Sequence, residues 1–313
     1  MTKKITVMGG GTGVYTVLSS LKNKNLELSA IVSMCDDGGS TGRLRDDYGV
    51  LPPGDIRRSL VALSSAENQL RKLFEHRFAN GGLAGHNFGN IFLAALEKTS
   101  GNFYNGVKLA SQILSVKGNV VPVTLDDVRL YAKLENGKII KGETNIDIPK
   151  HNPKLKITSI YTKPRGKANP DAIKKILEAD FIIIGPGDLY TSILPNLLIS
   201  GVSNALRKTK AKKIYICNLM TKKGETNKYT GKDFVENLEN YLGKNVLDYV
   251  LINNKKPGRT RLQKYSKQRS EIVIMPRGFK PKGLIKSDLI TNKGFIRHDT
   301  KKLGRLILKI INT

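Results

Sequence analysis

The stretch that decides the fold lies near the amino terminus and reads Ile5-Thr6-Val7-Met8-Gly9-Gly10-Gly11-Thr12-Gly13. Its first four residues predict a short buried strand, and its glycines predict a tight turn. A helical pattern follows at once, with one apolar face formed by Val14, Val17, Leu18 and Leu21. The first backbone N–H groups of such a helix lack internal partners, and the helix dipole favours negative charge there. We therefore expect an anion site at Gly10, Gly11, Thr12 and Gly13.

This loop fits neither of the two common phosphate-binding motifs. The dinucleotide fingerprint G-x-G-x-x-G, started at Gly9, needs a glycine where Val14 stands. A P-loop needs Gly-Lys followed by Ser or Thr, and the chain contains no such tripeptide. We favour a phosphate or nucleotide site, and a bare structural turn is the alternative.

Length, charge and aromatic content limit the classes of protein to which this chain can belong. The chain has 313 residues, 39% of them hydrophobic, which is enough for one large α/β domain or two smaller ones. Its formal charge of +27 is typical of nucleic-acid binding, but the lysines are spread along the chain and only 6% of the residues are aromatic. We expect a solvated basic surface, incidental nucleic-acid affinity at low salt, and no specific nucleic-acid partner.

Cysteine and histidine usage suggests a reduced compartment and no metal centre. Cys35 and Cys217 each follow a predicted strand and are expected to be small buried residues, and the four histidines show no metal-ligand spacing with them. No signal peptide is visible, and no apolar run is long enough to span a bilayer. We expect a cytoplasmic protein.

A second strand, residues 28–34, ends in Cys35-Asp36-Asp37-Gly38-Gly39-Ser40-Thr41-Gly42. Ligands of open parallel sheets lie beyond the carboxyl ends of the strands, where an acid often holds a ribose hydroxyl. Asp36 or Asp37 is therefore expected to bind a sugar diol, or Mg²⁺ through its oxygens, together with Gly39 and Ser40. An Asp-Gly turn without a ligand is the alternative.

The same stretch contains G-x-S-x-G, the pattern of a hydrolase nucleophile elbow, around Ser40. His298 lies downstream, as that order of catalytic residues requires. The elbow needs a helix directly after the serine, however, and residues 43–47 carry almost no apolar face before Pro52 and Pro53. We therefore do not favour a hydrolase.

Further along the chain, two more polar turns precede helices. Asp55 is expected to cap a helix whose first turn carries Arg57 and Arg58, which are either solvated or close to an anion. Asn87, in the turn before an apolar helix at residues 91–96, either caps that helix or binds a ligand, and the cap fits the spacing better.

Residues 120–148 change character. Short strands at 120–124, 128–134 and 139–140, with a turn at 135–138, predict an antiparallel insertion at about 118–150, followed by basic loops. The parallel pattern then resumes. We expect one domain over residues 1–313: a Rossmann-like, mostly parallel α/β sheet with helices on both faces and this small antiparallel β insertion.

The second half of the chain adds polar residues at the ends of strands. The strand at 181–184 leads into a glycine loop with Gly187 and Tyr190, and the strand at 214–217 ends at Asn218. Asp299 is expected to cap the last helix, and Arg297 precedes that helix, where a cation opposes the dipole unless an anion lies close. Arg297 is therefore a candidate for diphosphate contact, and a solvent-facing arginine paired with Asp299 is the alternative.

Taken together, several motifs resemble the gluconeogenesis factor family, which is related in fold to 2-phospho-L-lactate transferase. The resemblance covers essentially the whole chain. The motifs are Gly9-Gly10-Gly11-Thr12-Gly13, Asp36-Asp37-Gly38-Gly39-Ser40-Thr41-Gly42-Arg43-Leu44, Pro53-Gly54-Asp55-Ile56-Arg57, Gly85-His86-Asn87-Phe88-Gly89-Asn90, Gly185-Pro186-Gly187-Asp188-Leu189-Tyr190-Thr191-Ser192, Asn218-Leu219-Met220-Thr221 and Arg297-His298-Asp299.

The resemblance implies binding of a UDP-sugar such as UDP-N-acetylglucosamine, with other nucleotides such as NAD also admitted. It implies a regulator that links gluconeogenic carbon metabolism to cell shape and cell-wall synthesis, without established turnover. Arg297 and Tyr265 match the positions that contact the UDP-sugar. Asp188 stands where a serine is expected, and Lys223 where a proline is expected.

The alternative is a Mg²⁺-dependent, nucleotide-linked phospho-transferase in which Asp36 and Asp37 hold the metal. No activated base or nucleophile stands out in the sequence, which favours the regulator. A protein partner in cell-wall or carbon metabolism is expected for that regulator, and a homo-oligomer is compatible with the sequence.

Overall fold

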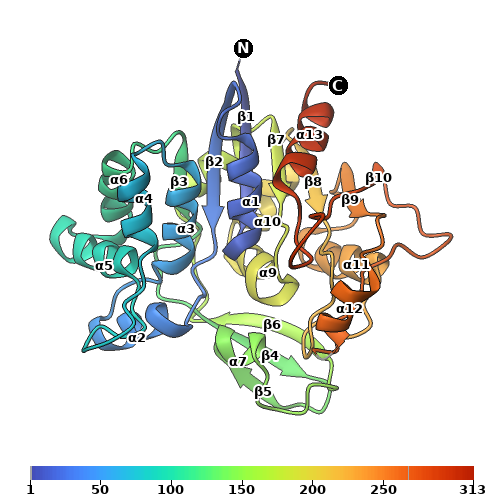
Figure 1. The fold of residues 1–313 in the computed structure, drawn as a ribbon, viewed down its shortest axis with the longest axis horizontal. Helices are drawn as coiled ribbons and strands as arrows, with labels where there is room; N and C mark the ends of the chain where they lie inside the picture. Colours follow the sequence, from blue (N-terminus) through green and yellow to red (C-terminus); the bar gives the residue numbers. More distant parts are fainter. Residues whose placement is uncertain (1, 267) are drawn as a thin grey trace.

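The computed structural model describes residues 2–266 and 268–313. Seven parallel strands form one sheet in the order β10-β9-β8-β7-β1-β2-β3 (Figure 1). These strands are β1 (Lys3–Gly9), β2 (Leu26–Val32), β3 (Asn119–Pro122), β7 (Phe181–Ile184), β8 (Lys212–Ile216), β9 (Tyr249–Asn253) and β10 (Leu284–Ser287).

Helices cover both faces of this sheet, as predicted. In Figure 1 the face toward the viewer carries α1 (Gly11–Leu21), α3 (Gly54–Leu63) and α13 (Thr300–Ile311). The far face carries α10 (Val202–Lys208) and α11 (Gly231–Leu242). Helix α8 (Pro170–Leu177) packs against α10. Strands covered on both sides read as continuous apolar runs, and every residue of β7 is buried. The predicted Rossmann-like fold class is confirmed.

The first helix packs as its apolar spacing predicts. Val14, Val17, Leu18 and Leu21 are all fully buried. Helix α13 packs against α1, and its N-cap is Asp299, whose carboxylate accepts the N–H groups of Lys301 and Lys302. The predicted cap at the last helix is thus confirmed.

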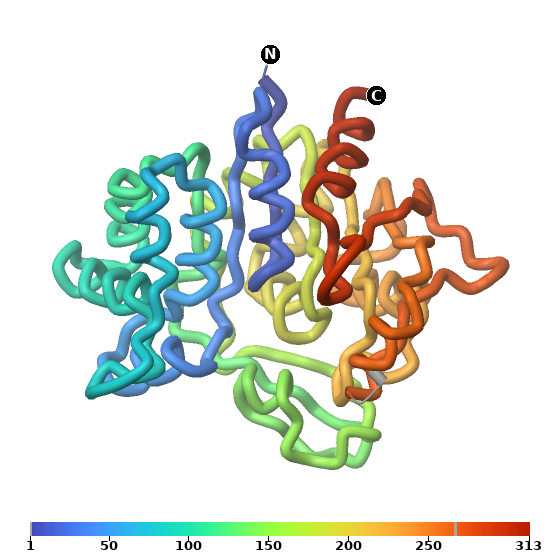
Figure 2. The backbone as a smooth tube through the Cα atoms, in the orientation of Figure 1, coloured from blue at the N-terminus to red at the C-terminus, as the bar shows by residue number. Residues whose placement is uncertain are grey.

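The insertion is a three-stranded antiparallel sheet in the order β5-β4-β6, with one short helix. Its elements are β4 (Arg129–Leu134), β5 (Ile139–Lys141), α7 (Glu143–Asp147) and β6 (Ile157–Lys163). The hairpin expected at 135–138 joins β4 to β5. Figure 2 shows this green segment at one end of the molecule and both termini at the other.

The insertion differs from its predicted bounds at both ends. Residues 120–122 belong to β3, which pairs in parallel with β2 and closes one edge of the main sheet. Their continuous apolar character is that of a strand covered on both faces. The third antiparallel strand is β6, beyond residue 150, and its flanking lysines concealed it among basic loops.

The remaining helices are α2 (Gly39–Tyr48), α4 (Asn68–Glu75), α5 (Phe88–Ser100), α6 (Phe103–Ile113), the π-helical turn Leu189–Ile193, α9 (Leu194–Leu198) and α12 (Arg259–Ser266). Helix α2 contradicts the expectation that no helix surrounds Ser40. Its missing apolar face is replaced by Arg45, a buried side chain that donates to the carbonyls of Asp36 and Val128, both at 2.9 Å.

Two smaller expectations concern the core and the membrane. Cys35 and Cys217 are both buried and unpaired, as predicted, and burial raises the pKa of each thiol to about 12. Within the described residues, no helix combines the length and the apolar character needed to cross a bilayer.

Candidate functional site

The site lies where the order of the strands reverses. From β1 the chain adds β2 and β3 on one side, and later β7 to β10 on the other. Open parallel sheets bind ligands beyond the carboxyl ends of their strands at such a switch point. A cavity of about 650 Å³ occupies this position, lined by the loops after β1, β2, β7 and β8, by α3 and by α7 of the insertion.

The glycine loops after β1 and β7 are in backbone contact across the switch point. A Cβ at Gly13 would lie 1.8 Å from the carbonyl oxygen of Pro186. A Cβ at Gly10 would lie 2.5 Å from the carboxylate of Asp55. Gly11 has a φ of +62°, which other residues rarely adopt. Gly13 and Gly10 leave no room for a Cβ, and Gly11 has a backbone conformation that favours glycine.

Most of the residues predicted from the sequence line this one cavity, although they come from distant parts of the chain. They are Gly10, Gly11, Thr12, Gly13, Asp36, Gly39, Ser40, Gly187, Asn218, Tyr265 and Arg297. The phenolic oxygen of Tyr265 accepts the N–H of Ile296 at 2.9 Å, which holds Tyr265 against the segment that carries Arg297. The two residues inferred from the family resemblance therefore lie on the same wall.

Three predicted residues are not among the described residues that line the cavity. The Asp37 carboxylate accepts the backbone N–H groups of Glu143 (3.1 Å) and Thr144 (2.8 Å), so it fastens the first turn of α7. Asn87 is buried and caps α5 by accepting the N–H of Asn90. Tyr190 is buried, and its hydroxyl contacts that of Tyr229 at 2.8 Å. For Asn87, the cap that the spacing favours is confirmed.

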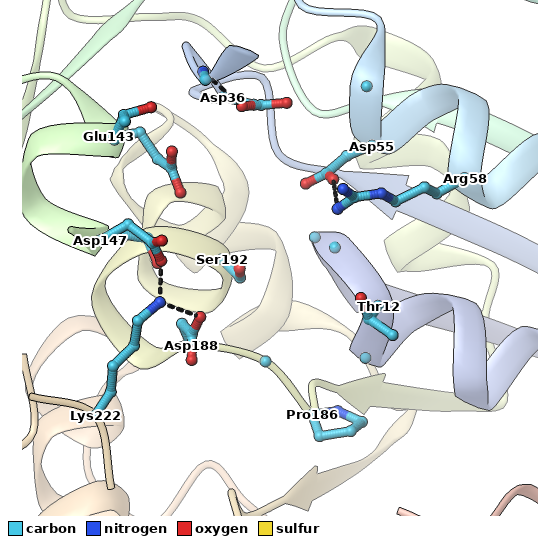
Figure 3. A pocket seen from close by; sticks show the side chains of 18 of the residues that line it. Thr12, Asp36, Asp55, Arg58, Glu143, Asp147, Pro186, Asp188, Ser192 and Lys222 are labelled. Atoms are coloured by element: carbon cyan, nitrogen blue, oxygen red, sulfur yellow. Dashed lines mark hydrogen bonds and ion pairs between the residues drawn. The ribbon is translucent and has the colours of Figure 1, made fainter. Parts of the chain in front are cut away.

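An acidic wall lines the cavity (Figure 3), and of its members the sequence predicted only Asp36 as a site residue. This wall consists of Asp36, Asp55, Glu143, Asp147 and Asp188. Burial, reinforced by the charge of Asp36, raises the pKa of Asp55 to about 6. Burial and the same neighbour raise the pKa of Glu143 to about 9. Asp55 is not the predicted cap of α3, whose N-cap is Pro53.

Cationic side chains balance this wall. Arg58 pairs with Asp55 at 3.2 Å, and the buried Arg57 donates to the side-chain oxygen of Asn90 at 2.9 Å. Burial, together with the charge of Arg58, lowers the pKa of Arg57 to about 10. Both arginines line the cavity. Of the two alternatives for this first turn, proximity to an anion fits this position better than solvation.

Lys222 connects three parts of the site. Its ammonium group contacts Asp147 of α7, lies 2.7 Å from Asp188 in the loop after β7, and lies 3.3 Å from the buried Glu225 (Figure 3). Burial and the charge of Asp188 raise the pKa of Glu225 well above its usual range. These three carboxylates are close enough together to hold a metal ion, and Lys222 supplies the positive charge there.

The part of the cavity lined by the loop after β8 and by the segment before α13 combines apolar and unpaired polar groups. Leu219, Ile296 and Tyr265 pack into one hydrophobic cluster. Among the described residues, the side-chain oxygen of Asn218 and Nε2 of His298 have no hydrogen-bond partner, although both are buried. Burial lowers the pKa of His298 to about 4, so its ring is neutral at pH 7. Flat apolar walls with unpaired polar atoms suit a heterocyclic base.

The Ser40 hydroxyl does not form a hydrolytic triad with His298. It is buried, accepts the N–H of Asn87 at 3.1 Å and lies 3.3 Å from Nδ1 of His86. These contacts fix α2 against the start of α5. Although a helix does follow Ser40, the geometry favours a structural hydroxyl at the edge of the cavity.

Fold and cavity together define a doubly wound α/β protein with a ligand crevice at its switch point. The family model of the 2-phospho-L-lactate transferase CofD matches residues 5–285. A protein of Nostoc sp. is 45% identical over 98% of this chain and 68% of its own length. The gluconeogenesis factor of Bacillus subtilis is 41% identical over 98% of both chains.

A solved structure agrees with these relatives. The crystal structure of a UPF0052 family member from Bacillus halodurans matches with a TM-score of 0.93 and 38% identity, covering 98% of this chain and 99% of that one. The chain therefore belongs to the gluconeogenesis factor family, within the wider 2-phospho-L-lactate transferase CofD family. The resemblance drawn from the sequence motifs is confirmed.

Proposed function

We propose that the cavity binds a UDP-sugar, such as UDP-N-acetylglucosamine, and that the protein is a cytoplasmic regulator. In this role it links gluconeogenic carbon metabolism to cell shape and cell-wall synthesis through a protein partner. The observation that carries the proposal is the backbone contact between Gly13 and Pro186. It brings two glycine loops to one rim, where the N-terminus of α1 opens onto the cavity.

The charges around the cavity support a diphosphate. The N-cap of α1, Gly10, makes no side-chain cap bond, and the Gly11 N–H donates to the Asp55 carboxylate, so the other first-turn N–H groups of α1 are those that a phosphate would meet. Arg58 and Arg297 line the same cavity, and Arg297 is exposed. Charge-assisted hydrogen bonds from these groups are stronger than neutral ones.

The dimensions and the polar end support a nucleoside. A cavity of about 650 Å³ lies within the usual range of small-molecule sites, roughly 300–1,000 Å³. The Asn218 amide carries both a donor and an acceptor, which match the imino N–H and a carbonyl of uracil. Tyr265 and Leu219 supply flat, apolar contact beside it.

A second candidate, a Mg²⁺-dependent transferase of nucleotide-linked phospho groups, is favoured by the acidic wall. The Asp37 carboxylate is already bonded to backbone N–H groups of α7. Asp36 and Asp55, which line the cavity, are therefore the acids that would hold the ion. Carboxylate oxygens suit Mg²⁺, which would offset charge on bridging phosphates. The matching family, 2-phospho-L-lactate transferase CofD, is named for the same class of chemistry.

A thermal-shift screen tests the proposed ligand. UDP-N-acetylglucosamine, UDP, GDP and NAD are each added with and without Mg²⁺. A ligand at about 100 times its Kd adds about 2.7 kcal/mol of stability. We expect the UDP-sugar to raise the melting temperature most, and a larger shift from GDP or NAD would refute the choice of nucleotide.

Turnover separates the two candidates. The protein is incubated with Mg²⁺, nucleotides and phosphorylated small acids, and products are sought by mass spectrometry. The regulator predicts no product. Product that disappears in Asp36→Asn would establish the transferase instead.

A further inference from the structure

The outward face of the inserted sheet combines tyrosines with cationic side chains. Strand alternation buries Leu130, Ala132, Leu134, Ile140, Ile160 and Thr162 on the inner side. The other side carries what we call the tyrosine face: Arg129, Tyr131, Lys133, Ile139, Lys141, Ser159, Tyr161 and Lys163. Helix α7 packs on β4 and β5, and its residues line the cavity.

The strand register arranges this face in rows. Tyr131 pairs with Lys141 on one side and with Tyr161 on the other, so one row crosses all three strands. Arg129 pairs with Lys163 in the next row. Because same-face residues of a strand recur about every 6.8 Å, the cations flank the tyrosines at close range.

The two tyrosines are directly opposite each other and stacked. Their ring centroids lie 5.3 Å apart and their planes differ by 12°. Tyr161 is 37% exposed, and among the described residues its one ring contact is with Tyr131. Cross-strand packing explains the pair itself. This packing does not explain why part of the Tyr161 ring remains exposed to solvent.

The charge of this face is positive throughout. It carries four cations and no carboxylate. Arg129 pairs with Asp46 at 2.7 Å. For Lys133, Lys141 and Lys163, the described part of the chain provides no ion-pair partner within 4.0 Å. Surface lysines are expected in a chain of charge +27, but their placement around an exposed aromatic pair is not.

We propose that the tyrosine face binds single-stranded nucleic acid, with bases stacking on the Tyr131–Tyr161 pair and phosphates contacting Lys133, Lys141 and Lys163. Base–aromatic stacking combined with a basic surface is the usual mode of sequence-tolerant single-strand binding. The carboxylates of an acidic peptide or the headgroups of an anionic membrane would use the lysines but present no flat ring to stack on the tyrosine pair. This inference does not depend on the nucleotide site.

The placement revises what the sequence led us to expect. Aromatic residues are scarce in the chain, and the lysines look evenly spread along it. The fold gathers two tyrosines and several lysines from β4, β5 and β6 on one surface. Binding by stacking reads no base edge, so it agrees with the expectation from the sequence that the protein has no specific nucleic-acid partner.

The test is fluorescence anisotropy of a labelled 12-nucleotide oligouridylate with the full chain at 150 mM salt. We expect Tyr161→Ala to weaken binding about tenfold and Tyr161→Phe to retain it, since a phenyl ring still stacks. Lys133→Ala should weaken binding and lower the salt dependence by about one phosphate contact. Lys301→Ala, an exposed lysine on α13, is the matched control and should change nothing.

Other polyanions show whether the tyrosine face binds a ligand of a different kind. Heparin binding should be the same in wild type and Tyr161→Ala, because heparin has no bases. Equal oligouridylate affinity in wild type, Tyr161→Ala and Tyr131→Ala would overturn the proposal. So would binding to vesicles of phosphatidylglycerol, or to an acidic peptide, in the absence of oligouridylate binding. Thermal melting of each variant, and its shift by UDP-N-acetylglucosamine, checks that the fold and the cavity are intact.

Discussion

Gly13 of α1 and Pro186 of the loop after β7 are in contact so close that a Cβ on Gly13 would lie 1.8 Å from the Pro186 carbonyl oxygen. The two residues are far apart in the sequence, and they follow the neighbouring parallel strands β1 and β7. Their contact joins the two glycine loops at the switch point of the sheet, and the candidate ligand rim depends on it.

Replacing Gly13 by alanine tests this contact. Alanine normally stabilises a helix by about 1 kcal/mol relative to glycine. Here we expect a loss of about 3 kcal/mol, because the new methyl group must displace backbone, and overpacking costs about 1–3 kcal/mol or more. Urea denaturation measures it. Gly82→Ala, in open space, is the control and should change stability by less than about 0.5 kcal/mol. Equal values for the two variants would contradict the contact.

Asn87→Ala separates a helix cap from a ligand contact. The Asn87 side chain accepts the N–H of Asn90 at the start of α5. Loss of such a cap costs about 1 kcal/mol. We expect this loss of stability in denaturation, with unchanged UDP-sugar affinity in calorimetry. A variant of normal stability that binds the ligand poorly would instead assign Asn87 to the site.

The acidic wall predicts a pH dependence of stability. The folded pKa of Glu143, about 9, lies above its ordinary value of 4.5, because of burial and the charge of Asp36. The folded state therefore holds more protons than the unfolded state between these values, and this residue's contribution to stability falls as pH rises through that window. Glu143→Gln removes the titration, so we expect its stability to vary less from pH 5 to 9. Parallel profiles for wild type and variant would refute this.

The affinity for the UDP-sugar should also depend on the protonation of the acidic wall. Deprotonation of Asp55 above its pKa of about 6 and of Glu143 toward pH 9 adds negative charge beside a diphosphate. Without Mg²⁺ we expect UDP-sugar affinity to fall as pH rises from 6 to 9. If the site is built for a Mg²⁺–nucleotide complex, affinity in the presence of Mg²⁺ should rise with pH instead, because ionised carboxylates hold the ion. Calorimetry at several pH values distinguishes the two.

Lys222 holds the insertion against the sheet. Lys222→Gln leaves Asp147, Asp188 and Glu225 clustered without their cation. The cluster is partly exposed, so we expect a loss of about 2 kcal/mol, between the values for surface and buried pairs. Adding Asp188→Ser should recover part of it by removing one charge. A double-mutant cycle measures the coupling, and strictly additive effects would show that the contact contributes nothing.

The sequence was sufficient for the parts of the site that follow strands directly. The glycine loops, Asp36 and Asn218 lie at strand ends, where position along the chain fixes position at the sheet edge. Arg297 could be placed because a cation before a helix is an electrostatic anomaly. Asp299 and Asn87 followed from the local chemistry of caps.

The sequence predicted the insertion but not its position over the cavity. Glu143 and Asp147 lie in a short polar helix whose local pattern contains no sign that it folds back over the cavity. What places it there is the contact from the distant Asp37 to the N–H groups of Glu143 and Thr144. Helix α2 was missed because it has almost no apolar face. It is held in place by the buried guanidinium of Arg45, which donates to backbone carbonyls.

Isothermal titration calorimetry of UDP-N-acetylglucosamine against wild type, Arg297→Ala and Arg305→Ala tests the central claim most directly. Arg297 lines the cavity, whereas Arg305 is exposed on α13. We predict one site per chain, weakened by roughly 1.5–3 kcal/mol in Arg297→Ala, the worth of a charge-assisted hydrogen bond, and unchanged in Arg305→Ala. No binding to wild type, or equal affinity in all three proteins, would contradict a UDP-sugar diphosphate at this rim.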